Sequence, residues 1–123
     1  MLESRAASSR AAVLAPLAHL DAVSVAVVAP FDPVPFLPGA PGAWTPQATA
    51  AFDPVRDVPA ARVVLSAAHY LPLGAAAYAD AVSRGAAYGT VQHGLLTPSA
   101  PPLPGVGTLL AWSDADARFW LAD

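Results

Sequence analysis

The 123-residue sequence contains no cysteine, lysine, asparagine or isoleucine. Without cysteine there is no disulfide bond, no thiolate nucleophile and no cysteine-ligated zinc or iron–sulfur site. Lysine, asparagine and isoleucine are encoded by AT-rich codons, so their absence indicates a GC-rich, bacterial genome. Charge is also scarce, because charged side chains make up 12% of the chain.

The six arginines are scattered along the chain, and the formal net charge is −3. A nucleic-acid-binding surface needs clustered basic residues, so no nucleic-acid partner is expected. No stretch of about 18 apolar residues is free of proline and charge, so no membrane span is expected. Residues 1–20 are rich in alanine, but Glu3, Pro16 and His19 argue against a signal peptide. We therefore predict a cytoplasmic location.

What the chain does contain is a high apolar fraction, 55%, much of it alanine. This composition predicts a globular domain with a buried core, and the length allows one such domain over residues 1–123. Proline is concentrated between residues 30 and 59, which hold eight of the fourteen prolines. We expect this segment to be a long irregular connection, because proline cannot donate a backbone hydrogen bond.

Short apolar segments and helix-forming segments alternate over the rest of the chain. The predicted strands are at residues 22–28, 62–66, 88–92 and 108–112, and the predicted helices at 3–18, 72–84 and 114–121. Strands joined through helices or long connections pair in parallel, and their apolar character favours burial on both faces. The predicted fold class is therefore α/β: a Rossmann-like parallel sheet of about four strands flanked by helices, with the strand at 88–92 in the centre.

Two of the three histidines follow predicted strands, His69 after 62–66 and His93 at the end of 88–92. Ligands of open parallel sheets bind at the carboxyl ends of the strands, so both histidines are candidate site residues. Gly94 allows a turn with positive φ and leaves space beside the His93 ring. An imidazole there can accept a proton from a hydroxyl group near neutral pH. The competing interpretation is structural: His93 shapes the loop and His69 packs beside Tyr70.

The remaining polar candidates have structural explanations. His19 is expected to interact with the end of the first helix, and Asp114 and Asp116 follow Ser113, the expected cap of the last helix. No metal site is expected, because no histidine or carboxylate pair has a ligand-like spacing. The sequence also lacks the G-x-G-x-x-G, P-loop and G-x-S-x-G motifs, so it predicts no cofactor.

The segment VQHGLLTP, its preceding helix and the later LLAWSDADARFW resemble the N-terminal half of GT-B-type bacterial glycosyltransferase-like proteins. The closest resemblance is to the CDP-glycerol glycerophosphotransferase and surface-polysaccharide families, over residues 60–123. It implies that His93 acts on the hydroxyl of a sugar or polyol acceptor, with His69, Gly94 and Ser113 as substrate-binding residues. It also implies a C-terminal donor-binding domain, which we expect to be absent from this chain, so that the chain alone is inactive.

Two alternatives to a transferase domain remain. The first is a non-enzymatic α/β binding or interaction module that uses an exposed edge against a partner. The second, a nucleotide-binding response-type domain, would need an acidic cluster at the strand ends and a lysine, and the chain has no lysine.

Overall fold

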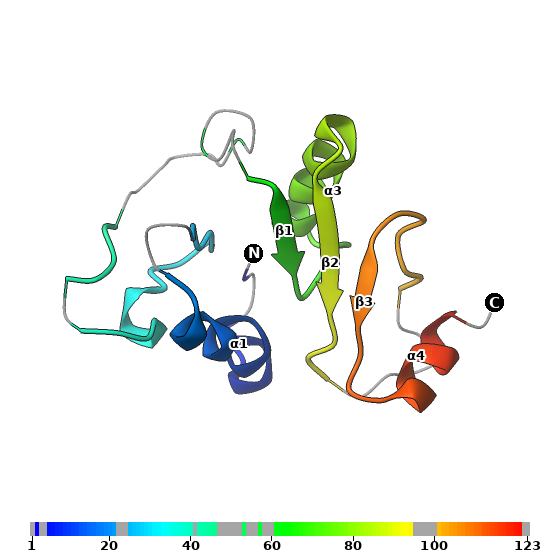
Figure 1. The fold of residues 1–123 in the computed structure, drawn as a ribbon, viewed down its shortest axis with the longest axis horizontal. Coiled ribbons are helices and arrows are strands. Elements are labelled where there is room, and N and C mark those ends of the chain that lie inside the picture. The colour runs from blue at the N-terminus through cyan, green and yellow to red at the C-terminus, as the bar shows by residue number, and fades with distance from the viewer. Residues whose placement is uncertain are drawn as a thin grey trace.

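The computed structural model of the chain describes residues 2, 5–21, 25–40, 42–46, 53, 57, 61–94 and 101–121. Within this part the protein is an α/β fold built on one three-stranded parallel sheet with the strand order β1-β2-β3 (Figure 1). The elements in chain order are α1 (Ala7–Leu14), η1 (Ala15–His19), η3 (Val34–Phe36), β1 (Val63–Ser66), α3 (Pro72–Arg84), β2 (Ala87–Val91), β3 (Thr108–Leu110) and α4 (Asp114–Leu121).

The sheet confirms the predicted parallel pairing and the central place of the strand near 88–92. Val63 pairs with Ala87 on one side of β2, and Gly89 pairs with Thr108 on the other. The predicted strand at 22–28 is not formed in its described part. Residues 25–28 are irregular there, and the one backbone bond to them is from the Leu2 N–H to the Val28 carbonyl. One bond does not make a ladder, so the sheet has three described strands and not four.

The core lies between α3 and the face of the sheet that α3 covers. Val64 and Tyr88, paired across β1 and β2, pack against Ala77 and Ala81 of α3. The Tyr88 ring also meets the Tyr78 ring edge to face, with their centroids 5.0 Å apart. Because the helix contributes alanines, it can approach the strands closely, and the aromatic rings fill the layer between them.

Local sequence signals set both ends of α3, whose bounds are those predicted. Pro72 opens the helix at a position where the missing N–H costs nothing, and Gly85 closes it with φ 67°. The Gly85 and Ala86 amides donate to the carbonyls of Val82 and Ala81, which completes a Schellman cap. Near the start, a Cβ at Gly74 would lie 1.9 Å from the Ala68 carbonyl oxygen, so only glycine lets the helix pack against the loop after β1.

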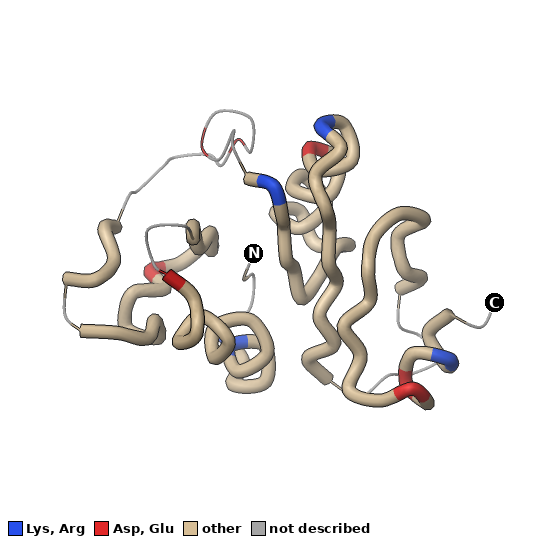
Figure 2. The backbone as a smooth tube through the Cα atoms, in the orientation of Figure 1, with Lys and Arg blue, Asp and Glu red and all other residues tan. Residues whose placement is uncertain are grey.

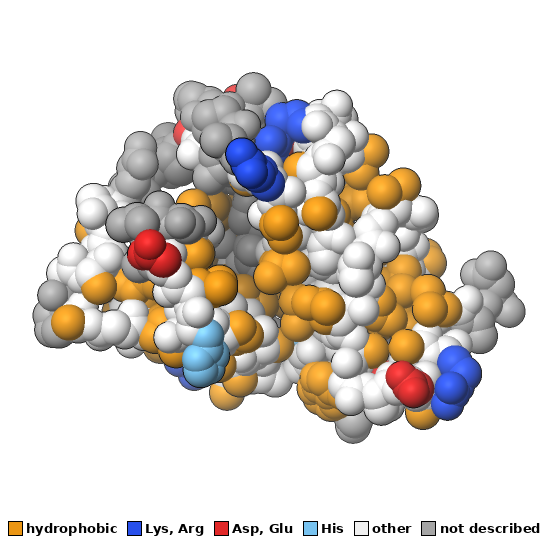
Figure 3. Space-filling model, in the orientation of Figure 1, with side chains coloured by type: hydrophobic (Ala, Val, Ile, Leu, Met, Phe, Trp, Pro, Cys, Tyr) orange, Lys and Arg blue, Asp and Glu red, His pale blue; other side chains and the backbone are white. Residues whose placement is uncertain are grey.

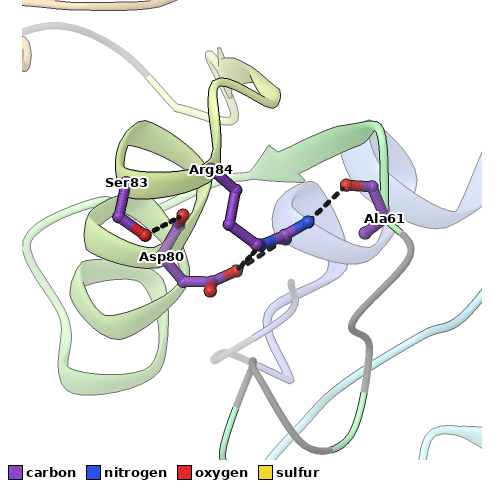
Figure 4. A network of polar contacts seen from close by, with 4 residues as sticks. All are labelled: Ala61, Asp80, Ser83 and Arg84. Carbon is purple, nitrogen blue, oxygen red and sulfur yellow. Dashed lines mark hydrogen bonds and ion pairs between the residues drawn. The ribbon is translucent and has the colours of Figure 1, made fainter.

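Arg84, at the far end of α3, pairs with Asp80 of the same helix and bonds to the backbone just before β1 (Figure 4). The Arg84 Nε and Nη2 atoms donate to Asp80 Oδ2 at 2.9 and 2.6 Å, and Nη1 donates to the Ala61 carbonyl at 3.0 Å. The Asp80 side chain is buried, whereas that of Arg84 is a quarter exposed. The hydrogen bond to Asp80 raises the pKa of Arg84, so the guanidinium remains charged.

In place of the one α-helix predicted at 3–18, the structure has a shorter α-helix followed by a 3₁₀ helix. Residues 3 and 4 lie outside the described part, α1 begins at Ala7, and the chain continues from Ala15 as the 3₁₀ helix η1. Pro16 stands at the start of η1. Its missing N–H and its ring are incompatible with a continuing α-helix, which explains the change.

The proline-rich segment 30–59 is described over residues 30–40, 42–46, 53 and 57, where the structure has the single turn η3 and a helical residue, Asp57, whose N–H donates to the Asp53 carbonyl at 2.8 Å. Asp32 Oδ1 accepts the Val34 N–H at the start of that turn. The Trp44 indole N–H donates to the Pro38 carbonyl at 2.6 Å. The described residues between 30 and 46 therefore agree with an irregular connection held by side-chain bonds.

The sheet face opposite α3 differs from the prediction that both faces are buried. β1 alternates between buried and exposed residues, with Val63 62% and Leu65 42% exposed. We name the positions whose side chains point away from α3 the open face: Val63, Leu65, Val91, Thr108 and Leu110. Figure 3 shows hydrophobic side chains over the strands on this side. A one-sided sheet needs alternating residues, which is the pattern that β1 has.

The charged residues that the structure describes lie on several elements and do not gather in one patch (Figure 2). No helix in the described part of the chain combines the length and the apolar character needed to cross a bilayer.

Candidate functional site at the carboxyl ends of the strands

The three parallel strands end along one edge of the sheet, which is the lower edge in Figure 1. β1 ends at Ser66, and its last residue pairs with Thr90 of β2. His69 and His93 follow these two paired residues at the same distance along the chain, three positions further on. Both predicted histidines therefore come after the carboxyl ends of neighbouring strands.

His69 is held by one hydrogen bond from its ring and by one aromatic contact. Its Nε2 lies 2.7 Å from the Pro102 carbonyl oxygen, and because a carbonyl can only accept, Nε2 carries the proton. Nδ1 is buried and has no hydrogen-bond partner among the described residues. The ring also meets Tyr70 edge to face, with the centroids 5.4 Å apart. This geometry supports a structural role, fastening the loop before β3, more than the predicted substrate-binding role.

His93 is partly exposed and makes no hydrogen bond to any residue that the structure describes. Its neighbour Gly94 has no positive φ, so the predicted left-handed turn is wrong. The predicted space is present, because a Cβ at Gly94 would meet no atom within 4 Å. The chain turns here without a glycine conformation because the Gly94 carbonyl accepts a bond from the Gln92 side chain.

Gln92 is the residue that sequence reasoning missed. Its side chain is 1% exposed: Oε1 accepts the Trp112 N–H at 2.9 Å, and Nε2 donates to the Gly94 carbonyl at 3.1 Å. Its backbone N–H donates to the Leu110 carbonyl. The bond from the Trp112 N–H to Gln92 Oε1 explains why β3 stops at Leu110 and not at the predicted 112, because a side chain takes the Trp112 amide. A polar residue at the end of a buried strand was the available signal.

Ser113 has the capping role that the sequence predicts. Its Oγ accepts the Asp116 N–H at 3.1 Å and donates to Asp116 Oδ2 at 2.8 Å, which satisfies the first turn of α4. Because the hydroxyl uses both its proton and a lone pair in this cap, its geometry supports capping and adds nothing for the predicted substrate contact.

An open depression of about 470 Å³ lies between the N-terminal helices and the same edge of the sheet. We name it the α1–β3 depression. One wall is formed by alanines of α1 and η1 with Pro16 and His19, and the other by Val91, Gln92, Leu110 and Trp112. His19 was predicted to have only a helix-end role, and the structure shows that it also borders this depression. Its neighbours come from the far end of the chain, so no local pattern could indicate the contact.

The described residues contain no group of three or more His, Asp or Glu side chains arranged to hold a metal ion. Comparisons with protein families, with curated proteins and with solved structures find no match to this chain. The functional argument therefore depends on the geometry of the strand ends.

Proposed function

We propose that this chain is the acceptor-side, Rossmann-like half of a GT-B-type bacterial glycosyl- or glycerophosphotransferase that acts in the cytoplasm on surface-polysaccharide precursors. His93 is the general base for a sugar or polyol hydroxyl. A donor-binding domain or subunit supplies the activated group, and this chain alone is inactive.

The observation that carries the proposal is the contrast between His93 and its surroundings. Gln92 and Gly94, on either side, are joined by a partly buried side-chain bond, whereas the His93 imidazole makes no hydrogen bond within the described residues. A rigid backbone with an uncommitted imidazole is what a general base needs, since its position is fixed and its lone pair is available. His69, with its committed ring, is the internal contrast.

The chemistry requires one proton transfer at this residue. The unprotonated ring nitrogen of His93 accepts the acceptor's hydroxyl proton while the hydroxyl oxygen attacks the donor, and the donor's leaving group departs on the side of the donor domain. General-base assistance of this kind contributes about 10²- to 10⁴-fold in rate. The side chain at position 94 is a hydrogen, which leaves room for the acceptor beside the ring.

Replacement of His93 tests the proposal. With the donor-binding domain present, His93→Ala and His93→Gln should each lose transfer by about 10²-fold or more, because neither side chain can act as a base near neutral pH. Asp114→Asn, an exposed position in the first turn of α4, is the matched control and should keep full activity. Full transfer by both His93 variants would contradict the proposal.

The open face favours one second candidate, a non-enzymatic interaction module. Val63, Leu65 and Leu110 expose 62%, 42% and 46% of their surfaces on one side of a sheet. Contiguous exposed apolar residues are typical of surfaces that bind another protein. Retained transfer in the His93 variants would leave this second function as the better interpretation.

A further inference from the structure

The α1–β3 depression is open to solvent, and it is lined mostly by apolar residues. Its volume, about 470 Å³, lies within the range of roughly 300–1,000 Å³ that is usual for small-molecule sites. Most of its lining is aliphatic, including Ala11, Ala15, Val91 and Leu110. It reaches Gln92, which precedes the proposed base in the chain, and His93 itself is not among the described residues of its lining.

No lysine or arginine is among the described residues that line this depression. The chain has no lysine. Three of the described arginines make their ring or carboxylate contacts away from the depression. Arg10 stacks over Phe36 at 4.3 Å, Arg5 over Phe31 at 5.0 Å, and Arg84 is paired with Asp80. A phosphate-bearing acceptor would therefore find no guanidinium or ammonium partner among the described lining residues, whereas a neutral sugar needs none.

Trp112 provides an exposed aromatic surface at the depression. It is 57% exposed, although its backbone N–H is fixed by Gln92 at 2.9 Å. The two other tryptophans use their indole N–H groups within the protein, Trp44 with Pro38 and Trp120 with Pro101. An indole on a fixed backbone buries apolar area with little loss of conformational entropy.

His19 supplies a polar group at the opposite wall. It is exposed at the end of η1 and has no hydrogen bond within the described residues. Neutral sugars present an apolar face of C–H groups and a rim of hydroxyls. The apolar walls and the indole match that face, and an imidazole that can donate and accept matches the rim.

From these contacts we infer that the α1–β3 depression binds the ring of a neutral sugar, with the ring against Trp112 and a hydroxyl toward His19. The role of this sugar as the acceptor rests on the proposed function. Within that function, the inference selects a neutral saccharide over a glycerol or ribitol phosphate.

Binding can be measured on the chain itself by saturation transfer to methyl β-D-glucopyranoside and methyl β-D-galactopyranoside at millimolar concentration. Trp112→Ala should weaken binding about tenfold or more, because the stacking surface is lost. Ala15→Leu, which fills the depression from an exposed helix position and leaves the aromatic ring intact, should weaken it as well. Trp44→Ala is the matched control and should bind as wild type does.

The possible results test three claims separately: the binding site, the ligand class and the proposed base. Glycoside binding that is unchanged in Trp112→Ala and Ala15→Leu would overturn the site, and binding of glycerol 3-phosphate with no glycoside binding would overturn the ligand class. Neither result bears on the proposed role of His93 as the general base. Glycoside binding that depends on Trp112, together with full transfer by His93→Ala, would instead confirm the depression and contradict the proposed base.

Discussion

At the scale of single residues, Gln92 controls the geometry of the site more than either histidine does. Its amide joins the end of β2 to Gly94 on one side and to the Trp112 backbone on the other. An amide is the side chain that can accept at one atom and donate at the other, so neither a carboxylate nor an aliphatic side chain replaces it. The proposed base and the proposed sugar platform therefore depend on the same buried group.

Gln92→Leu should destabilise the fold, because the Trp112 N–H and the Gly94 carbonyl would both lose their partner. Leaving such groups unpaired costs about 1–3 kcal/mol in the free energy of unfolding. Gln92→Glu keeps the acceptor for the Trp112 N–H but cannot donate to Gly94, and it places a charge at a position that is 1% exposed. It should therefore cost at least as much. Urea denaturation measures both, and an unchanged midpoint in either variant would show that the two bonds contribute nothing.

At the scale of elements, local signals predict helices better than strands. The bounds of α3 and α4 follow from Pro72, Gly85 and Ser113, because caps act within one turn of the residue that makes them. The segment 22–28 has a strand-like sequence, yet a strand also needs a partner at its edge, and sequence does not name one. The same limit applies to the site: the positions of His69 and His93 after strands could be predicted, whereas the bonds of His69 to Pro102 and of Gln92 to Trp112 join distant segments.

The ion pair at the end of α3 should respond asymmetrically to mutation. Arg84→Ala leaves the carboxylate of Asp80 buried without its cation, whereas Asp80→Ala leaves a guanidinium that is already partly in solvent. Since an unpaired buried charge is the costlier product, Arg84→Ala should lower the melting temperature more than Asp80→Ala does. The double variant should be more stable than Arg84→Ala alone. Equal effects of the two single changes, with additive loss in the double variant, would show that the pair is not coupled.

At the scale of the whole molecule, α3 covers one face of the sheet, and the other face and the carboxyl edge carry the exposed groups. The open face contributes Val91 and Leu110 to the α1–β3 depression, and η1 brings His19 to the same place. Residues from the two ends of the chain thus meet where His93 follows β2. The sheet face opposite α3 is therefore part of the proposed site.

The central claim is that His93 is an uncommitted imidazole facing the acceptor, and its reactivity with diethyl pyrocarbonate tests this most directly. The reagent acylates unprotonated ring nitrogens, and mass spectrometry of the peptides reports each histidine separately. His69, with Nε2 bonded to Pro102 and Nδ1 buried, is the internal reference. We predict that His93 reacts much faster than His69 and that methyl β-D-glucopyranoside slows the reaction of His93 while leaving that of His69 unchanged. A His93 that reacts as slowly as His69 in the free chain, or whose rate the glycoside does not alter, would contradict the account.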